Sequence, residues 1–328
     1  MPTPRRARRS FAALVSTGLF ALTLVGAALP AQAQRVIRIV VPFGTGAVQD
    51  TVARSFNNEL GEVLGANVIV ENRAGAGGTV GASLVAKAPP DGNTLVLAAA
   101  SHNIAAHLYA KLPYDTLKDF VGVATVGNAG YVLMVSSALN VGTTADFIRE
   151  VKAHPGQYNY ASAGNGSATH LAMAAFLAKA GLQMTHIPMK STGEAVNEVL
   201  AGRVQAVISS SIGVIGLQND ARVKSLASTG KRRSPFLPNL PTVEESGLPG
   251  YEFDSWIGLL APAGTPKAEV DRLNAAVTRV MGEPAMKERF ARLGVEPRTS
   301  SAEEFQKLLR ADYDTMGVVV KASGARID

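Results

Sequence analysis

The chain of 328 residues carries 32 basic and 26 acidic residues and contains no cysteine. The absence of cysteine excludes disulfide bonds, thiolate zinc sites and cysteine nucleophiles. Because 47% of the residues are hydrophobic, a chain of this length is expected to be held together by its apolar core alone.

The N-terminal segment has the three parts of an export signal. Four arginines between residues 5 and 9 precede an uncharged apolar run, Phe11–Leu29, and a small-residue cleavage site, Ala31-Gln32-Ala33. We therefore expect cleavage near Ala33, a mature chain that begins at Gln34, and a location in the periplasm. The alternative is an uncleaved anchor, because the apolar run could just span a bilayer. The pair Arg8-Arg9 leaves both the general secretory and the twin-arginine route open.

Removal of residues 1–33 changes the charge balance. The segment holds four of the 32 basic residues and no acidic residue, so 28 basic and 26 acidic residues remain. This near-neutral balance is not typical of a nucleic-acid-binding protein. The cluster Lys231-Arg232-Arg233 is explained by a solvated loop. We therefore expect a soluble protein that binds no nucleic acid.

Strands and helices alternate along the mature chain. Runs rich in β-branched residues and bounded by turn signals predict ten strands, and apolar residues at helical spacing lie between them. This βαβ order predicts parallel sheets covered by helices on both faces. The predicted strands are Val36–Phe43, Asn67–Glu71, Thr94–Ala99, Gly122–Val126, Tyr131–Ser136, Tyr158–Ser162, Thr185–Pro188, Val204–Ser209, Lys224–Ser228 and Trp256–Ala261.

The mature length and one long irregular segment predict two lobes. Residues 235–249 contain four prolines and one glycine and are interpreted as a crossing between lobes. The first lobe is expected to be discontinuous, made of residues 34–133 and 255–328, and the second to comprise residues 134–254. Two crossing strands, near residues 131–136 and 250–256, would form a hinge of the kind that closes around a ligand.

Two glycine-rich turns each lead from a predicted strand into a predicted helix. The first, Gly44-Thr45-Gly46, precedes a helix from about Gln49, and the second, Ala163-Gly164-Asn165-Gly166, precedes a helix from about Ser167. Glycine allows a ligand to approach the backbone, and the first turn of a helix has free N–H groups at its positive end. Each junction is therefore a candidate anion site. The alternative is that the glycines only make tight turns.

Other candidate ligand-binding residues stand beside these turns or at strand ends. For Asp50 the alternative role is support of the positive end of its helix, and for His170 it is packing against the strand. For Lys190 the alternative is a solvated side chain. The candidates outside the glycine-rich turns are Phe43, Asp50, Ser101, Ser167, His170, Lys190 and Ser209.

Motifs along the whole mature chain resemble those of the Bug-type periplasmic receptors of tripartite tricarboxylate transporters. The resemblance implies an α/β fold of the periplasmic binding protein type (Venus flytrap). In that fold each lobe is a sheet flanked by helices, and two crossing strands form a hinge. It also implies capture of a small carboxylate-containing ligand and its delivery to membrane transporter subunits. The motifs are Val41–Phe43, Val70–Gly78, Pro90–Gly92, Leu112–Asp115, Tyr160–Gly166, Leu240–Val243, Gly258–Pro266 and Val320–Gly324.

Three segments depart from the family pattern. The family's proline-proline-glycine-glycine loop is replaced by Gly44–Val48, although Asp50 is retained. The usual tyrosine-lysine-glycine appears as Met189-Lys190-Ser191, and Ser209-Ser210-Ser211 stands where the family often has bulkier or acidic residues. Because all three fall at strand ends that face the expected cleft, they suggest an altered ligand preference.

The motifs of common enzymes are missing from the sequence. The run Gly75–Gly81 fails the dinucleotide fingerprint because Val80 stands where a glycine is required. No G-x-S-x-G elbow and no H-E-x-x-H pair occurs, so neither a hydrolase nor a zinc site is expected. We predict a monomeric receptor that is not an enzyme and needs no cofactor or metal. The alternative function is a ligand-loaded sensor that docks a membrane signalling protein.

Overall fold

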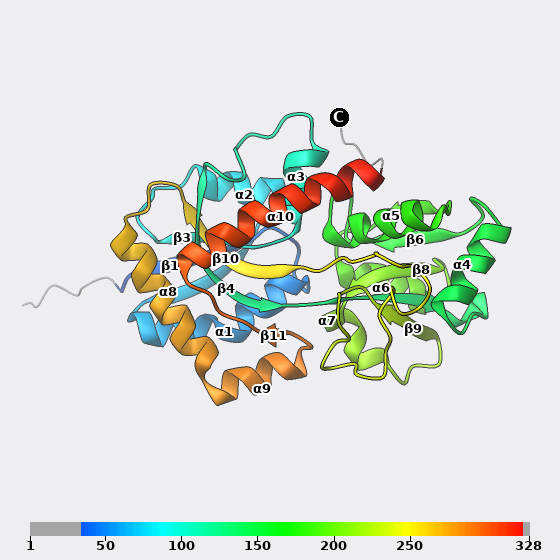
Figure 1. Cartoon of the computed structure of the whole chain (residues 1–328). Helices are drawn as coiled ribbons and strands as arrows, with labels where there is room; N and C mark the ends of the chain where they lie inside the picture. The colour runs from blue at the N-terminus through cyan, green and yellow to red at the C-terminus, as the bar shows by residue number, and fades with distance from the viewer. Residues whose placement is uncertain (1–33, 324–328) are drawn as a thin grey trace, which may run out of the picture. The chain divides into compact units, whose positions relative to one another are not determined.

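The structure, a computed structural model, describes residues 34–323, so the predicted export signal and its cleavage site lie outside the described residues. From Arg35 onward the described chain belongs to one compact unit. This unit contains two β-sheets, each covered by helices on both faces (Figure 1). The expected two-lobed α/β fold is therefore confirmed, with one sheet in each lobe.

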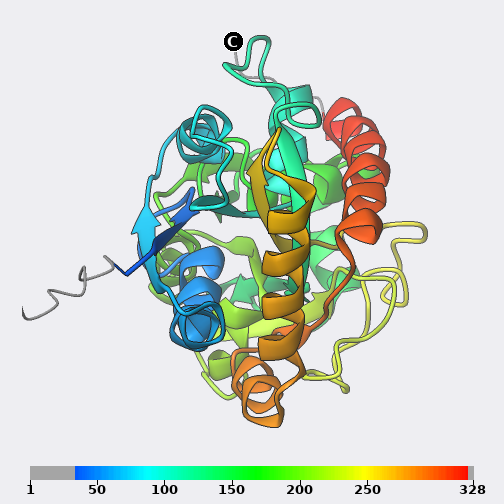
Figure 2. The same cartoon turned by 90° about the vertical axis from the view of Figure 1, so that its left-hand side faces the viewer.

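The first lobe is built on a six-stranded sheet of order β11-β4-β10-β3-β1-β2. Neighbouring residues of β1 point to opposite faces of the sheet, because side chains of a strand alternate with a period of two. Ile37 and Ile39 pack in the apolar cluster that contains residues of α1 and α8. Val40 packs in the apolar cluster on the other face, which contains residues of α2 and α10. Helices α1 and α8 lie side by side (Figures 1 and 2). The strands are β1 (Val36–Val41), β2 (Asn67–Asn72), β3 (Thr94–Ala99), β4 (Phe120–Asn128), β10 (Trp256–Pro262) and β11 (Glu296–Pro297).

The helices of the first lobe are amphipathic and bury one face against the sheet. In α1, Val52, Phe56 and Leu60 are fully buried at four-residue spacing, which places them on one face of the helix against the sheet. The helices are α1 (Val48–Leu64), α2 (Thr79–Ala86), α3 (Ser101–Leu108), α8 (Lys267–Gly282), α9 (Pro284–Arg292) and α10 (Ala302–Ser323).

The second lobe is built on a five-stranded sheet of order β7-β6-β8-β5-β9. Helices α4 and α5 share one apolar cluster with this sheet, and α6 and α7 share the cluster on its opposite face. The elements are β5 (Tyr131–Ser136), α4 (Thr144–Ala153), β6 (Asn159–Ser162), α5 (Ala168–Ala180), β7 (Thr185–Pro188), α6 (Thr192–Leu200), β8 (Ala206–Ser210), α7 (Ser211–Val214) and β9 (Val223–Ser228).

All ten predicted strands are present within a few residues, but the prediction of parallel sheets is only partly right. β1 pairs in parallel with β2 and β3, and β6 with β7 and β8. In contrast, β10 runs antiparallel to β3 and β4, and β5 runs antiparallel to β8 and β9. The physical reason is that β5 and β10 are entered from the other sheet without the crossover helix that a parallel neighbour needs.

The chain passes between the sheets twice, over residues 129–130 and over the irregular segment 229–255. The irregular structure predicted for residues 235–249 is confirmed. Helix α10 contacts α3 and α5, and its residues Met316 and Val320 pack in the core cluster of the second sheet. The residue boundaries of the lobes therefore stay a prediction. Within residues 34–323 no helix has the length and apolar character to cross a bilayer.

Candidate functional site

Four helices begin at one cavity. The chain leaves the carboxyl ends of β1, β3, β6 and β7 and enters α1, α3, α5 and α6, and residues of the first turn of each helix line the same cavity. Ligands of open α/β sheets bind at this edge, outside the carboxyl ends of the strands. The cavity lies between the two lobes. Its lining residues are Phe43, Ala47, Val48, Gln49, Ala99, Ser101, Ala129, Tyr131, Ala163, Ser167, Ala168, Thr169, Thr192, Ser255 and Ile257.

The lobes touch at the rim of this cavity. A Cβ atom placed on Gly77 of the first lobe would lie 2.9 Å from the carbonyl oxygen of Asn165 in the second. A Cβ placed on Gly44 would lie 3.9 Å from the carbonyl oxygen of Lys190. The cavity measures only about 30 Å³. The structure thus corresponds to a closed arrangement, in which the two lobes meet over a narrow, largely buried space.

Free backbone donors line the cavity at the starts of α1 and α5. Among residues 34–323, no protein acceptor is bonded to the N–H groups of Val48 and Gln49 or of Ala168 and Thr169. These groups carry the partial positive charge of the helix N-terminus, which favours an anion. Each lobe therefore presents at least one pair of unpaired N–H donors to the cavity.

The glycine-rich turns before these helices use most of their own donors internally. The N–H of Gly46 bonds to Asp50 Oδ2 at 2.9 Å, and that of Ala163 bonds to Thr169 Oγ1 at 2.9 Å. The N–H of Gly164 bonds to Ser162 Oγ, and that of Gly166 to His170 Nδ1. The N–H groups of Gly46, Gly164 and Gly166 are therefore engaged, and the free donors that line the cavity lie inside the first turn of each helix.

The polar lining of the cavity is neutral. Of the residues that the structure describes, none with a charged side chain lines it, and its polar side chains are hydroxyls together with the amide of Gln49. Burial raises the pKa of Tyr131 to about 12, so its phenol stays protonated near neutral pH. An anion in this cavity would be balanced by helix termini and hydroxyl donors rather than by a cationic side chain.

Four of the predicted site residues line the cavity: Phe43, Ser101, Ala163 and Ser167. Phe43, Ser101 and Ser167 are all less than a tenth exposed. Ser167 also caps α5, because its Oγ accepts the N–H of His170 at 3.2 Å. Its hydroxyl contacts Thr169 Oγ1 at 3.0 Å as well. Ser167 thus has a structural role in addition to its place at the cavity.

The remaining predicted residues surround the cavity without lining it. Thr45, Gly46, Asn165 and Lys190 are exposed, and Gly164 is half-buried. Gly166, the last residue of the turn that precedes α5, is buried. Ser209 is fully buried at the end of β8, where its hydroxyl donates to the carbonyl oxygen of Ser210.

Asp50 is engaged within the first lobe. Its carboxylate forms an ion pair with Arg54 at 2.8 Å and accepts hydrogen bonds from the Asn72 side chain and the Gly46 N–H. The residue is only 3% exposed, and it does not line the cavity. In this structure Asp50 holds the loop before α1 against the neighbouring strand β2.

His170 belongs to a stack of aromatic rings behind the second glycine-rich turn. Its ring lies 4.0 Å from that of His186, and both rings stack on Tyr160. Burial lowers the pKa of His170 to about 4 and, together with the neighbouring His170, that of His186 to about 3. Both imidazoles are therefore neutral near pH 7, which lets His170 Nδ1 accept the N–H of Gly166.

Sequence reasoning missed several lining residues for which signals were available. Gln49 and Thr169 stand inside helices whose starts were predicted, and Thr192 follows the segment 189–191 that departs from the family pattern. Tyr131 and Ser255 lie on the two predicted crossings. A search of the first helical turns, instead of the glycines alone, would have found the first three.

Two lobes joined by two connections, with helix N-termini around a cavity between them, define a solute-binding receptor of the periplasmic binding protein type. The family model described as "Tripartite tricarboxylate transporter family receptor" matches residues 52–325. The chain belongs to this family of receptors, whose members work with membrane transporters.

Curated relatives extend over nearly the whole chain. A Pseudomonas sp. (strain P51) protein of the tcbD–tcbE intergenic region is 34% identical, over 87% of this chain and 85% of its own length. BugT of Bordetella pertussis is 32% identical, over 96% of this chain and 98% of its own.

Solved structures show the same fold. A Rhodopseudomonas palustris protein with adipate superposes with a TM-score of 0.85 at 31% identity, over 90% of this chain and all of that one. MatC from the same organism, with bound malate, gives 0.83 at 31% identity over 87% of this chain and 99% of its own. The periplasmic binding protein BugD gives 0.84 at 31% identity, over 89% and 98%. The resemblance predicted from the sequence motifs is confirmed.

Proposed function

We propose that the cavity binds one small carboxylate-containing acid through the free N–H groups at the starts of α1 and α5. The observation that carries this proposal is the convergence of four helix N-termini on a cavity whose described lining has no charged side chain. Helix termini stabilise an anion without a counterion. The acid would be captured between the lobes and delivered to the membrane subunits of a tripartite transporter.

The number of donors is sufficient for useful affinity. A hydrogen bond to a charged group contributes about 1.5–3 kcal/mol, and a micromolar complex requires about 8 kcal/mol. Two pairs of N–H donors, at Val48 and Gln49 and at Ala168 and Thr169, reach that range once closure removes water. The hydroxyls of Ser101 and Thr192 add donors for a second carboxylate or a hydroxyl group of the ligand.

The lining also argues for the chemical class of the ligand. An amino acid would bring an ammonium group, but no carboxylate side chain lines the cavity among the described residues. Asp50, the acidic residue that comes next after the loop, is already held by Arg54 and Asn72. Mono- and dicarboxylic acids without an amino group fit this arrangement better. The adipate and malate complexes of related proteins are consistent with that class.

The same residues support the proposal that the protein binds its ligand without catalysis. The cavity offers hydroxyls, an amide and a phenol whose pKa is about 12, and no group among them works as a general base near pH 7. The receptor is proposed to act as a monomer in the periplasm after removal of residues 1–33. Mass analysis of protein recovered from the periplasm of an exporting host tests the predicted start at Gln34.

Thermal melts of the exported protein test the proposed ligand class. A panel of mono-, di- and tricarboxylates, hydroxy acids, amino acids and uncharged analogues is added at millimolar concentration. A ligand present at 100 times its Kd stabilises the fold by about 2.7 kcal/mol, which a melt detects readily. Stabilisation by acids without an amino group is the expected result. Stabilisation by amino acids or uncharged compounds alone would contradict the proposal.

A further inference from the structure

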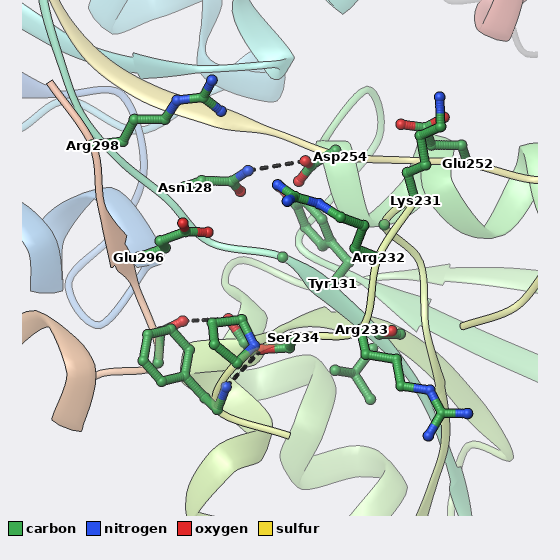
Figure 3. A pocket seen from close by; sticks show the side chains of 18 residues that line it. Asn128, Tyr131, Lys231, Arg232, Arg233, Ser234, Glu252, Asp254, Glu296 and Arg298 are labelled. Atoms are coloured by element: carbon green, nitrogen blue, oxygen red, sulfur yellow. Dashed lines mark hydrogen bonds between the residues drawn. The ribbon is translucent and has the colours of Figure 1, made fainter. Parts of the chain in front are cut away.

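A second and larger cavity lies on the opposite face of the two connections between the lobes. We call it the hinge groove; it measures about 450 Å³, and it is lined by Asn128, Gly130 and Val132 of one connection and by Glu252 and Asp254 of the other. Figure 3 shows Asn128 donating a hydrogen bond to Asp254 across the two connections. Ala129, Ser255 and Ile257, from the same two stretches of chain, line the ligand cavity instead, and Tyr131 lines both spaces. Side chains of extended segments alternate between two faces, so the cavity and the groove lie on opposite sides of the same two segments.

Because of this arrangement, the ligand cavity and the hinge groove are expected to change width in opposite directions. A rotation about the connecting segments that opens the ligand cavity must bring the walls of the hinge groove together. Two lining residues of the groove already join the lobes, because Ser211 Oγ donates a hydrogen bond to the carbonyl oxygen of Gly294 at 2.7 Å. In the closed arrangement of this structure the groove measures about 450 Å³.

Charges of both signs stand on both walls of the hinge groove. Glu296 and Arg298, which follow α9, come from the first lobe, whereas Lys231, Arg232 and Glu252 come from the segment between β9 and β10 (Figure 3). None of these five side chains has an ion-pair partner within the described part of the chain. Arg233, which also lines the groove, differs because it pairs with Glu245 at 2.9 Å on its own wall.

We propose that Glu296 and Arg298 form ion pairs with Lys231, Arg232 and Glu252 when the receptor opens, and that these pairs hold the ligand-free receptor open. The inference rests on the proposed closure of the lobes around a ligand. The five charged residues would then influence ligand affinity, although none of the five lines the ligand cavity. Because ligand binds the closed form, an interaction made only in the open form weakens the apparent affinity.

The sign of the effect separates this proposal from a purely structural role. Removing the pairs raises the closed fraction, so the double variant Glu296→Gln/Arg298→Gln should bind its acid more tightly than the wild type. Two exposed ion pairs correspond to a change of about 3- to 10-fold in the open–closed equilibrium. High salt should produce the same change in the wild type and little change in the variant.

The test measures the distance between the lobes without any ligand. Because the chain has no cysteine, Lys87→Cys on the first lobe and Ala178→Cys on the second place two spin labels at exposed positions. Distance distributions are recorded at low and high salt for the wild type, for Glu296→Gln/Arg298→Gln, and for the control Arg233→Gln.

The expected result is a population that shifts toward the closed distance in the double variant and, at high salt, in the wild type, with the control unchanged. Combining Arg298→Glu with Glu252→Arg should restore the open population that either reversal alone removes. Identical distributions for wild type and double variant at both salt concentrations would overturn the proposal. A failure of the proposed ligand class leaves this readout intact, because no acid is added.

Discussion

The imidazole rings of His170 and His186 stack with their centroids 4.0 Å apart, and together they support the turn that leads into α5. His170 Nδ1 accepts the N–H of Gly166, and His186 Nε2 lies 2.6 Å from the hydroxyl of Ser162. That hydroxyl oxygen in turn accepts the N–H of Gly164. Two side chains outside the cavity thus fix the backbone that delivers the helix N-terminus to it.

This stack predicts a loss of stability in mild acid. Burial lowers the pKa of His170 to about 4 and that of His186 to about 3, both below the ordinary value of 6.5. The folded state therefore binds fewer protons than the unfolded state, so their contribution is complete above about pH 6.5 and is lost as the pH falls toward 4. In melts between pH 7.5 and 4.5, His170→Gln/His186→Gln should show a shallower fall than the wild type. His154→Gln, at the part-exposed end of α4, is the control, and equal slopes in all three proteins would contradict the prediction.

Ser167 should influence both stability and binding. Its hydroxyl caps α5 and lines the cavity, so Ser167→Ala is expected to lower the free energy of unfolding by about 1 kcal/mol and to weaken acid binding as well. Thr143→Ala is a matched control, because Thr143 caps α4 away from the cavity. Chemical denaturation and calorimetry should show that both variants lose stability but only Ser167→Ala loses affinity. Equal affinities would remove the Ser167 hydroxyl from the ligand site.

Gly77 should be required for closure. It has a φ of +64° and faces the carbonyl oxygen of Asn165 across the rim, where an added Cβ would lie at 2.9 Å. Gly65 has nearly the same φ, +61°, with no atom within 4 Å of an added Cβ. Gly77→Ala and Gly65→Ala should therefore lose similar stability from backbone strain, about 1 kcal/mol. Only Gly77→Ala should bind its acid at least about tenfold more weakly, because a tenfold loss corresponds to 1.4 kcal/mol of closure energy. Unchanged affinity for Gly77→Ala would show that the rim contact is not part of the bound state.

Asp50 should prove to be a structural residue. Its carboxylate is held by Arg54, Asn72 and the N–H of Gly46, and the residue is 3% exposed. Asp50→Asn is expected to lower the free energy of unfolding by about 1–3 kcal/mol, because a buried, charged acceptor of three hydrogen bonds is replaced by a neutral amide with one acceptor oxygen. The ranking of acids in the ligand panel should stay the same, with amino acids still excluded. A variant that changes this ranking would place the Asp50 carboxylate in the ligand site.

The local structure was predictable to a greater extent than the arrangement of its parts. β-Branched runs such as Val36–Val41 and Thr94–Ala99 specify their strands locally, so all ten predicted strands are found. The antiparallel direction of β5 and β10 depends on how the chain passes between the lobes. The local hydrophobic periodicity of a strand does not predict the direction of its neighbour. The two-residue strand β11 is too short to give a sequence signal.

The candidate site was predicted in its location but not in its donors. The glycines indicated the correct strand–helix junctions, yet the side chains of Ser162 and His170 already accept the N–H groups of Gly164 and Gly166. These local hydrogen bonds determine which N–H donors stay free for a ligand. The bonds themselves depend on side-chain χ angles, which the sequence does not specify. The hinge groove was not predicted, because its walls come from segments that are distant from one another in the chain.

A crystal structure of the receptor with the acid that gives the largest thermal stabilisation tests the central claim most directly. We predict carboxylate oxygens at hydrogen-bonding distance, about 2.7–3.2 Å, from the N–H groups of Val48 or Gln49 and of Ala168 or Thr169, with no cationic side chain in contact. A ligand held by charged side chains, or one bound in the hinge groove instead of between the helix N-termini, would contradict the account.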